Sequence, residues 1–216
     1  MSVNLKLALF MLVVLVPSLR IHEYAHAWAA LRQGDHGPRQ WGRLTLNLKA
    51  HVDKFGTLLL PALLLVLVAS GQLLPVFAYA KPMPVNPSAM RNAERGMRWY
   101  ALAGPLANLA LTVLFGVGLR ATGASRGGTL TLFLFAGLVV NVVLFVFNLI
   151  PIPGLDGSKL VAPLLGYRAR QVYQNLDEYL PLFMLLVYFI LAGITLRVVQ
   201  VLGNAVCRLI GVGDCL

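Results

Sequence analysis

The sequence predicts an all-α polytopic membrane protein with about five transmembrane helices, or alternatively six, and a short β-hairpin or re-entrant strand between the first two. Of its 216 residues, 58% are hydrophobic and 12% are charged, whereas soluble domains carry about a quarter charged residues. The mean hydropathy is +0.76, and the apolar residues gather in runs long enough to cross a bilayer. We therefore expect one membrane-embedded domain over residues 1–216, without a separate soluble module.

The apolar runs define the candidate spans. Each run is near or above the roughly 18 residues that indicate a transmembrane helix. The runs cover residues 5–33, 55–74, 99–120, 129–150 and 179–202. Gly34 directly follows the first run, as expected for a helix that stops there. If the five spans alternate in direction, Arg32 and Arg91 lie on opposite sides of the membrane. The basic residues then divide almost evenly between the two sides, so the positive-inside rule gives no orientation.

The charges and the cysteines exclude several classes of protein. The formal net charge is +10, but the basic residues are spaced between apolar runs and form no stripe. This spacing argues against nucleic acid as a partner and favours anionic membrane lipids. Cys207 and Cys215 lack C-x-x-C spacing, so we expect two incidental thiols and neither a disulfide framework nor a thiolate metal cage.

Two connections have patterns of their own. Residues 43–49 alternate leucine with polar residues, which is the period of a half-buried strand. Because lipid cannot satisfy an unpaired strand, it must pair with a neighbour such as residues 50–53, or lie at the interface or in a protein-lined cavity. Residues 80–87 contain three prolines and are expected to be extended at the membrane surface.

The chemistry is concentrated in His22-Glu23-Tyr24-Ala25-His26, inside the first apolar run. Residues four apart share one face of a helix, so both imidazoles can reach one metal ion while Glu23 handles a water proton. This is the H-E-x-x-H arrangement of zinc hydrolases. Ionisable groups at membrane depth cost several kcal/mol unless they are paired or coordinated, which favours a functional site over a packing pair of histidines.

A catalytic zinc ion usually takes three protein ligands and leaves a fourth position for water. The remaining histidines, His36 and His51, and the remaining acidic residues are the candidates. Asp156 stands out because it closely follows an apolar run, in the segment 148–157, where two prolines and two glycines break the helix. Spacing alone leaves an alternative open, in which Asp156 caps a helix that begins near Ser158.

Taken together, these motifs resemble the site-2 protease family of intramembrane zinc metalloproteases, in particular its compact bacterial branch without an appended regulatory domain. The matching segments are His22 to His26, Gly34-Asp35, Gly42 to Asn47, His51 to Asp53 with Gly56-Thr57, Ala80 to Pro87, Ala103 to Asn108, and Asn148 to Gly157. Several independent motifs in the same order make chance similarity implausible. Leu48 stands where the family usually has proline, a departure that leaves the zinc motifs unaffected.

The resemblance implies that His22, His26 and Asp156 bind one zinc ion and that Glu23 activates the attacking water. It also implies that Asn148 acts near the substrate, where an amide could donate to the developing oxyanion or hold the substrate backbone. Asn108 is a second candidate for this role. Asn108 could instead hydrogen-bond between helices, as we expect for Asn141, two turns before Asn148.

The expected function is hydrolysis of a peptide bond within or near the transmembrane segment of a single-span membrane protein. Leu44, Thr45, Leu46 and Asn47 could pair with the unwound substrate by strand addition, or could form a purely structural hairpin. We expect an integral multi-pass protein of the bacterial cell membrane. The alternative functions are a multi-spanning metal-ion transporter and a non-catalytic membrane scaffold. A transporter usually has repeated halves and acidic residues on several spans, a pattern that this sequence lacks. A scaffold would not need Glu23 between the two histidines.

Overall fold

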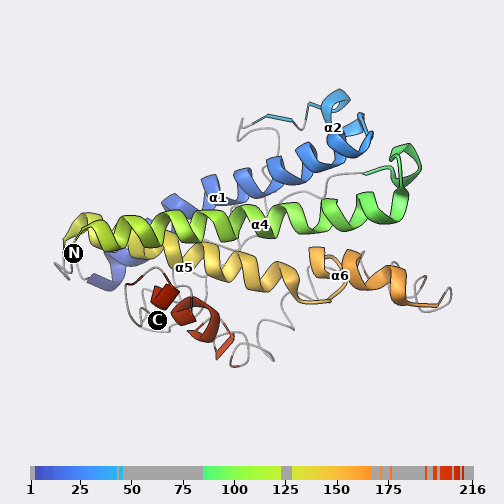
Figure 1. The fold of residues 1–216 in the computed structure, drawn as a ribbon. Helices are drawn as coiled ribbons and strands as arrows, with labels where there is room; N and C mark the ends of the chain where they lie inside the picture. The colour runs from blue at the N-terminus through green and yellow to red at the C-terminus, as the bar shows by residue number, and fades with distance from the viewer. Residues whose placement is uncertain are drawn as a thin grey trace.

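The computed structural model describes residues 3–42, 44–45, 85–122 and 128–166, with scattered positions between 171 and 211. Three long helices lie side by side in this part of the chain (Figure 1): α1 (Val3–Gln33), α4 (Ala93–Ala121) and α5 (Thr129–Leu149). The short elements are α2 (Gly37–Gln40), α6 (Asp156–Val161) and the 3-10 turns η3 (Pro87–Ala89) and η4 (Ala162–Leu164).

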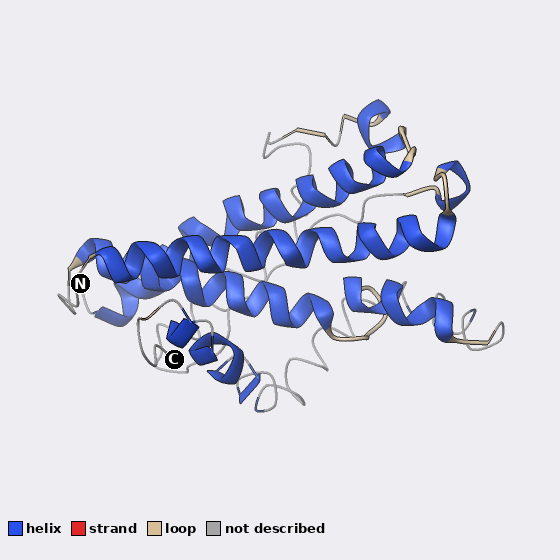
Figure 2. Cartoon of the chain, in the orientation of Figure 1, coloured by secondary structure: helices blue, strands red, loops and turns tan. Residues whose placement is uncertain are grey.

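The three long helices are each long and apolar enough to cross a membrane, and they match the predicted spans 5–33, 99–120 and 129–150. The described residues are mostly helical and contain no strand (Figure 2). This result confirms the helical class. The candidate span 55–74, most of 179–202 and residues 46–53 of the expected hairpin lie outside the described residues, whereas Leu44 and Thr45 form a bend.

The helix ends follow local signals in the sequence. Helix α1 stops at Gln33 because Gly34 adopts a φ of 110°, a conformation that favours glycine. Helix α4 is capped at its start by Asn92, whose side-chain oxygen accepts a hydrogen bond from the backbone N–H of Arg95 at 2.9 Å. The glycine stop that the sequence predicts after the first run is therefore confirmed.

The end of α1 and the start of α4 meet at the same end of the bundle, and the two helices run in opposite directions (Figure 1). The backbone N–H of Arg91 donates to the carbonyl of Gln33 at 2.8 Å. The predicted placement of Arg32 and Arg91 on opposite sides of the membrane is therefore wrong. Apolar run lengths indicate where a chain can cross a membrane, but they carry no signal for where it returns.

A buried apolar cluster between α1 and α5 holds the bundle together. Leu15 and Leu19 of α1 pack there with Leu138 and Leu144 of α5, and all four are buried. By contrast, Leu114 on the outer side of α4 is exposed, as expected for a helix face that contacts lipid. The bundle thus has an apolar interior and an apolar exterior.

Near the C-terminus, Cys207 is fully buried against this apolar cluster and is disulfide-bonded. The expectation of two incidental thiols is therefore wrong for this residue. Two cysteines without a recognisable spacing give no signal of pairing in the sequence.

Candidate metal centre

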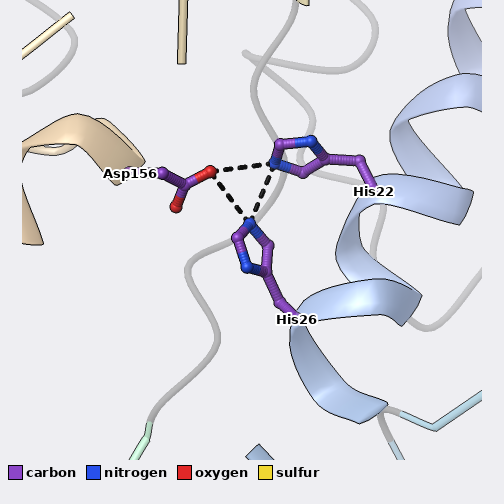
Figure 3. Close-up of side chains that lie close together, drawn as sticks. All are labelled: His22, His26 and Asp156. Atoms are coloured by element: carbon purple, nitrogen blue, oxygen red, sulfur yellow. Dashed lines mark hydrogen bonds and ion pairs between the residues drawn. The ribbon is translucent and has the colours of Figure 1, made fainter. Parts of the chain in front are cut away.

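Three side chains from α1 and α6 converge in the interior (Figure 3). The Nε2 atoms of His22 and His26 lie 3.0 Å apart. Asp156 Oδ2 lies 3.1 Å from the first and 2.9 Å from the second. The residues are only 3%, 2% and 5% exposed, respectively. Two imidazole nitrogens and one carboxylate oxygen in this arrangement could hold a metal ion.

Asp156 reaches the histidines because the chain turns back after α5. Gly154 adopts a φ of 87°, and the N–H of Leu155 donates to the carbonyl of Ile152 at 3.0 Å, which closes a tight turn. A Cβ atom on Gly157 would overlap the carbonyl oxygen of Leu149, so only glycine lets α6 start this close to the end of α5. Leu155 is the N-cap of α6, and the alternative in which Asp156 is a helix cap gains no support.

The second nitrogen of each imidazole has its own partner. Nδ1–H of His22 donates to the side-chain oxygen of Asn108 at 2.6 Å. Nδ1–H of His26 donates to the backbone carbonyl of Tyr100 at 2.6 Å. A ring that carries its proton on Nδ1 turns the lone pair of Nε2 toward the cluster, which is the form that binds metal.

Lys159 holds the other oxygen of Asp156. Its Nζ lies 2.9 Å from Oδ1, one turn further along α6, and its side chain is 31% exposed. Burial alone would raise the pKa of Asp156, but its interactions with the two histidines and with Lys159 outweigh burial, so the pKa lies well below its ordinary value. Burial likewise opposes the charge on Lys159, but the carboxylate raises its pKa. The carboxylate of Asp156 is therefore ionised, with Oδ2 directed at the histidines.

Helix α4 carries a glycine beside the two imidazole rings. A Cβ atom on Gly104 would overlap Nε2 of His26 and would lie 2.6 Å from Nε2 of His22. The missing side chain therefore leaves a small cradle next to both metal-facing nitrogens. The three ligand atoms are also close enough that one ion at the usual zinc–ligand distance of about 2.0–2.1 Å reaches all of them. The residues present fit a zinc ion.

Replacement of Gly104 with alanine is expected to weaken zinc binding by at least about tenfold, because the new methyl group displaces both imidazoles. Alanine favours helix more than glycine does, so the helix itself is not the cause of the loss. Competition with a chelator of known affinity measures the effect. Gly118→Ala in the same helix is the matched control, since its Cβ would meet only the flexible end of Leu134. Equal zinc affinity in the two variants would contradict the prediction.

The other predicted residues lie around this centre. Glu23 is half-buried, follows His22 in α1, and lies near enough to Lys159 for their charges to interact. Asn148 is half-buried at the end of α5, and its amide donates to the carbonyl of Leu144 at 2.8 Å. Asn108 is fully buried behind His22.

Two contacts of the centre were not predicted from the sequence, and one candidate ligand has a different role. Lys159 was not predicted, although its spacing of three residues from Asp156 on a helix is a usable signal. The contact of His26 with the carbonyl of Tyr100 leaves no signal in a side-chain pattern. Asp35, a candidate third ligand, instead accepts from the backbone N–H groups of Gly37 and Asn86 at 2.9 and 2.8 Å.

Apolar helices that enclose two histidines, an aspartate and an adjacent glutamate define the class of intramembrane zinc metalloproteases. Residues 117–191 match the model of Peptidase family M50. The chain is 34% identical over 176 residues to "Putative zinc metalloprotease YwhC" of Bacillus subtilis, covering 77% of this chain and 74% of the relative. The chain belongs to peptidase family M50, the site-2 proteases, which confirms the predicted family, enzyme class and zinc cofactor.

Two further relatives carry the name "Putative zinc metalloprotease Rip2". The one from Mycobacterium tuberculosis H37Rv is 32% identical over 175 residues, which cover 79% of this chain and 63% of the relative. The one from Mycolicibacterium smegmatis is 35% identical over 150 residues, which cover 68% and 53%. No solved structure matches the chain significantly.

Proposed function

We propose that residues 1–216 form one membrane-embedded protease domain that cleaves a single-span membrane protein within or near its transmembrane segment. His22, His26 and Asp156 are the zinc ligands, and Glu23 is the general base. The observation that carries this proposal is the buried triangle of ligand atoms, 2.9 to 3.1 Å apart, with Glu23 beside it in the sequence. Site-2 proteases generally cleave transmembrane substrates, in keeping with this substrate class.

Each residue of the proposed site has its own role in hydrolysis. When bound, zinc supplies Lewis acidity, which lowers the pKa of a water molecule and polarises the scissile carbonyl. Glu23 takes the proton from the attacking water and passes it to the leaving nitrogen. Lys159 keeps Asp156 ionised and oriented through Oδ1. Asn148 uses the second N–H of its amide to hold the substrate backbone or the developing oxyanion.

The substrate must unwind before it is cleaved, because an intact helix uses its carbonyl groups in its own hydrogen bonds. Leu44, Thr45, Leu46 and Asn47 are proposed to receive the unwound segment by strand addition. The alternating sequence supports this role. Leu44 also packs against the buried cluster that contains Ala27 and Tyr100, which adjoin His26 in the sequence and in its hydrogen bonding.

The tryptophans support a place in the membrane for this protein. Trp28, Trp41 and Trp99 are 48%, 51% and 47% exposed. They lie near the end of α1, after α2 and near the start of α4, where α1 and α4 meet. Tryptophan prefers the interface between lipid and water, so this end of the bundle is proposed to lie at one interface of the bacterial cell membrane. His26 is two residues from Trp28, about 3 Å along the helix.

Reconstitution tests the proposed function. The purified protein, placed in liposomes with a panel of single-span substrates, is expected to cleave at least one substrate within or beside its transmembrane segment. Removal of metal with a chelator should abolish cleavage, and added zinc should restore it. Cleavage that persists in verified metal-free protein would exclude the zinc mechanism. Cleavage confined to soluble control peptides would exclude the substrate class.

A further inference from the structure

A chain of buried polar groups connects the three long helices behind His22. Nδ2–H of Asn108 on α4 donates to Oδ1 of Asn141 on α5 at 2.9 Å. Nδ2–H of Asn141 donates in turn to the hydroxyl of Ser18 on α1 at 3.0 Å and to the carbonyl of Gly137 at 2.8 Å. Asn108, Asn141 and Ser18 are 0%, 0% and 2% exposed. The helix-to-helix hydrogen bond expected for Asn141 is confirmed.

These hydrogen bonds have a direction, and a backbone atom fixes it. The carbonyl of Gly137 can only accept, so Asn141 must turn its NH₂ group toward it and its oxygen toward Asn108. Asn108 must then donate its own NH₂ group to Asn141 and present its oxygen to His22. An oxygen at that position accepts only from a protonated Nδ1. The proton position on His22 is thus determined on a different helix, three hydrogen bonds away.

His26 reaches the same state by a shorter route. Its Nδ1–H donates directly to the backbone carbonyl of Tyr100, an acceptor that no side-chain rotation can reverse. Asn108, by contrast, has an amide that could flip and offer its NH₂ group to His22. The flipped amide would favour a proton on Nε2 of His22, the form that cannot bind metal through that atom. The proton position on His22 therefore depends on a residue that fixes the orientation of the Asn108 amide, whereas the proton position on His26 does not.

We propose that Asn141 is a positioning residue for zinc binding: anchored on the Gly137 carbonyl, it holds the amide of Asn108 in the orientation that keeps the proton of His22 on Nδ1. Asn141 itself does not touch the metal ligands. This proposal rests on the proposed role of His22 as a zinc ligand. It assigns to Asn141 an effect on the metal centre beyond its packing between helices.

Zinc affinity gives the first test, by chelator competition on the full-length protein in detergent. Asn108→Leu is expected to weaken zinc binding by about 10- to 100-fold, and Asn141→Leu by roughly tenfold, since Asn108 remains but can flip. In the Asn108→Leu background, Asn141→Leu should add little, because both substitutions break one pathway. Fully additive losses, as from two independent packing defects, would overturn the proposal.

Thr112→Val is the matched control. Thr112 is fully buried on the same helix, one turn after Asn108, and its hydroxyl donates to the backbone carbonyl of Asn108 at 2.9 Å. The substitution removes a buried polar group without touching the side-chain pathway. It should therefore leave zinc affinity unchanged. An Asn141→Leu variant that binds zinc as tightly as Thr112→Val would overturn the proposal.

The wild-type protein allows a second test that does not depend on any variant folding. The chain has four histidines, so ¹⁵N-histidine labelling gives a spectrum simple enough to assign. In metal-free protein, the neutral ring of His22 should carry its proton on Nδ1. A bare Nδ1 would overturn the proposal. Wild-type protein that binds no zinc would instead refute the proposed function, so the two failures are distinguishable.

Discussion

Replacement of Glu23 with glutamine is expected to slow peptide-bond hydrolysis by about 10²- to 10⁴-fold, the usual contribution of a general acid–base group. Glutamine keeps the size of the side chain but cannot accept the proton of the attacking water at neutral pH. Because Glu23 is not one of the three clustered ligands, zinc content should remain at the wild-type value. The measurement is single-turnover cleavage of a reconstituted substrate, with zinc determined on the same sample.

Glu94→Gln provides the matched control for this substitution. Glu94 is exposed at the start of α4 and forms an ion pair with Arg98, away from the metal centre. The control should cleave at the wild-type rate, since an exposed ion pair contributes little to stability. Cleavage by Glu23→Gln at the same rate as Glu94→Gln would rule out Glu23 as the base.

Asp156→Ala is expected to produce the second large effect, a loss of zinc affinity of at least about 100-fold, since removal of a direct ligand should exceed the usual cost of removing a supporting residue. The substitution removes one of the three proposed ligand atoms. It also leaves the ammonium group of Lys159 without the carboxylate that lies 2.9 Å away, and an unbalanced positive charge near the site repels a cation. Zinc content after dialysis against a weak chelator measures the loss, and cleavage should disappear with it.

Asp35→Asn is the control for loss of a buried carboxylate. Asp35 is 2% exposed, and both of its oxygens accept from backbone N–H groups outside the metal centre. This variant should lose some thermal stability but keep one zinc ion per chain. If Asp35→Asn lost zinc while Asp156→Ala retained it, the assignment of the third ligand would be wrong.

The sequence predicted the parts of the site that depend on local geometry. His22 and His26 lie on one face of α1 because they are four residues apart in a helix of 3.6 residues per turn. The turn that presents Asp156 could be anticipated from the prolines and glycines after the apolar run. The same local rules located the three long helices of the described residues and the glycine at which α1 stops.

The parts that the sequence could not give depend on contacts between distant residues. Asn108 hydrogen-bonds to a histidine 86 positions earlier in the chain, and no spacing rule connects such a pair. The sequence consequently leaves Asn108 with two candidate roles, one near the substrate and one in hydrogen bonds between helices, and its hydrogen bonds to His22 and Asn141 are of the second kind. The meeting of Gln33 and Arg91 depends likewise on where the chain returns after a long connection, which apolar run lengths do not encode.

The close approach of α4 to both histidines limits how a substrate can enter. A side chain at position 104 would overlap both rings, and Asn108 and Tyr100 each accept a hydrogen bond from one of them. A substrate of the proposed class would therefore have to reach the metal centre from a side other than the contact between α1 and α4. Among the described residues around the centre, Glu23, Asn148 and Lys159 are partly exposed, so they are the groups that a substrate could reach.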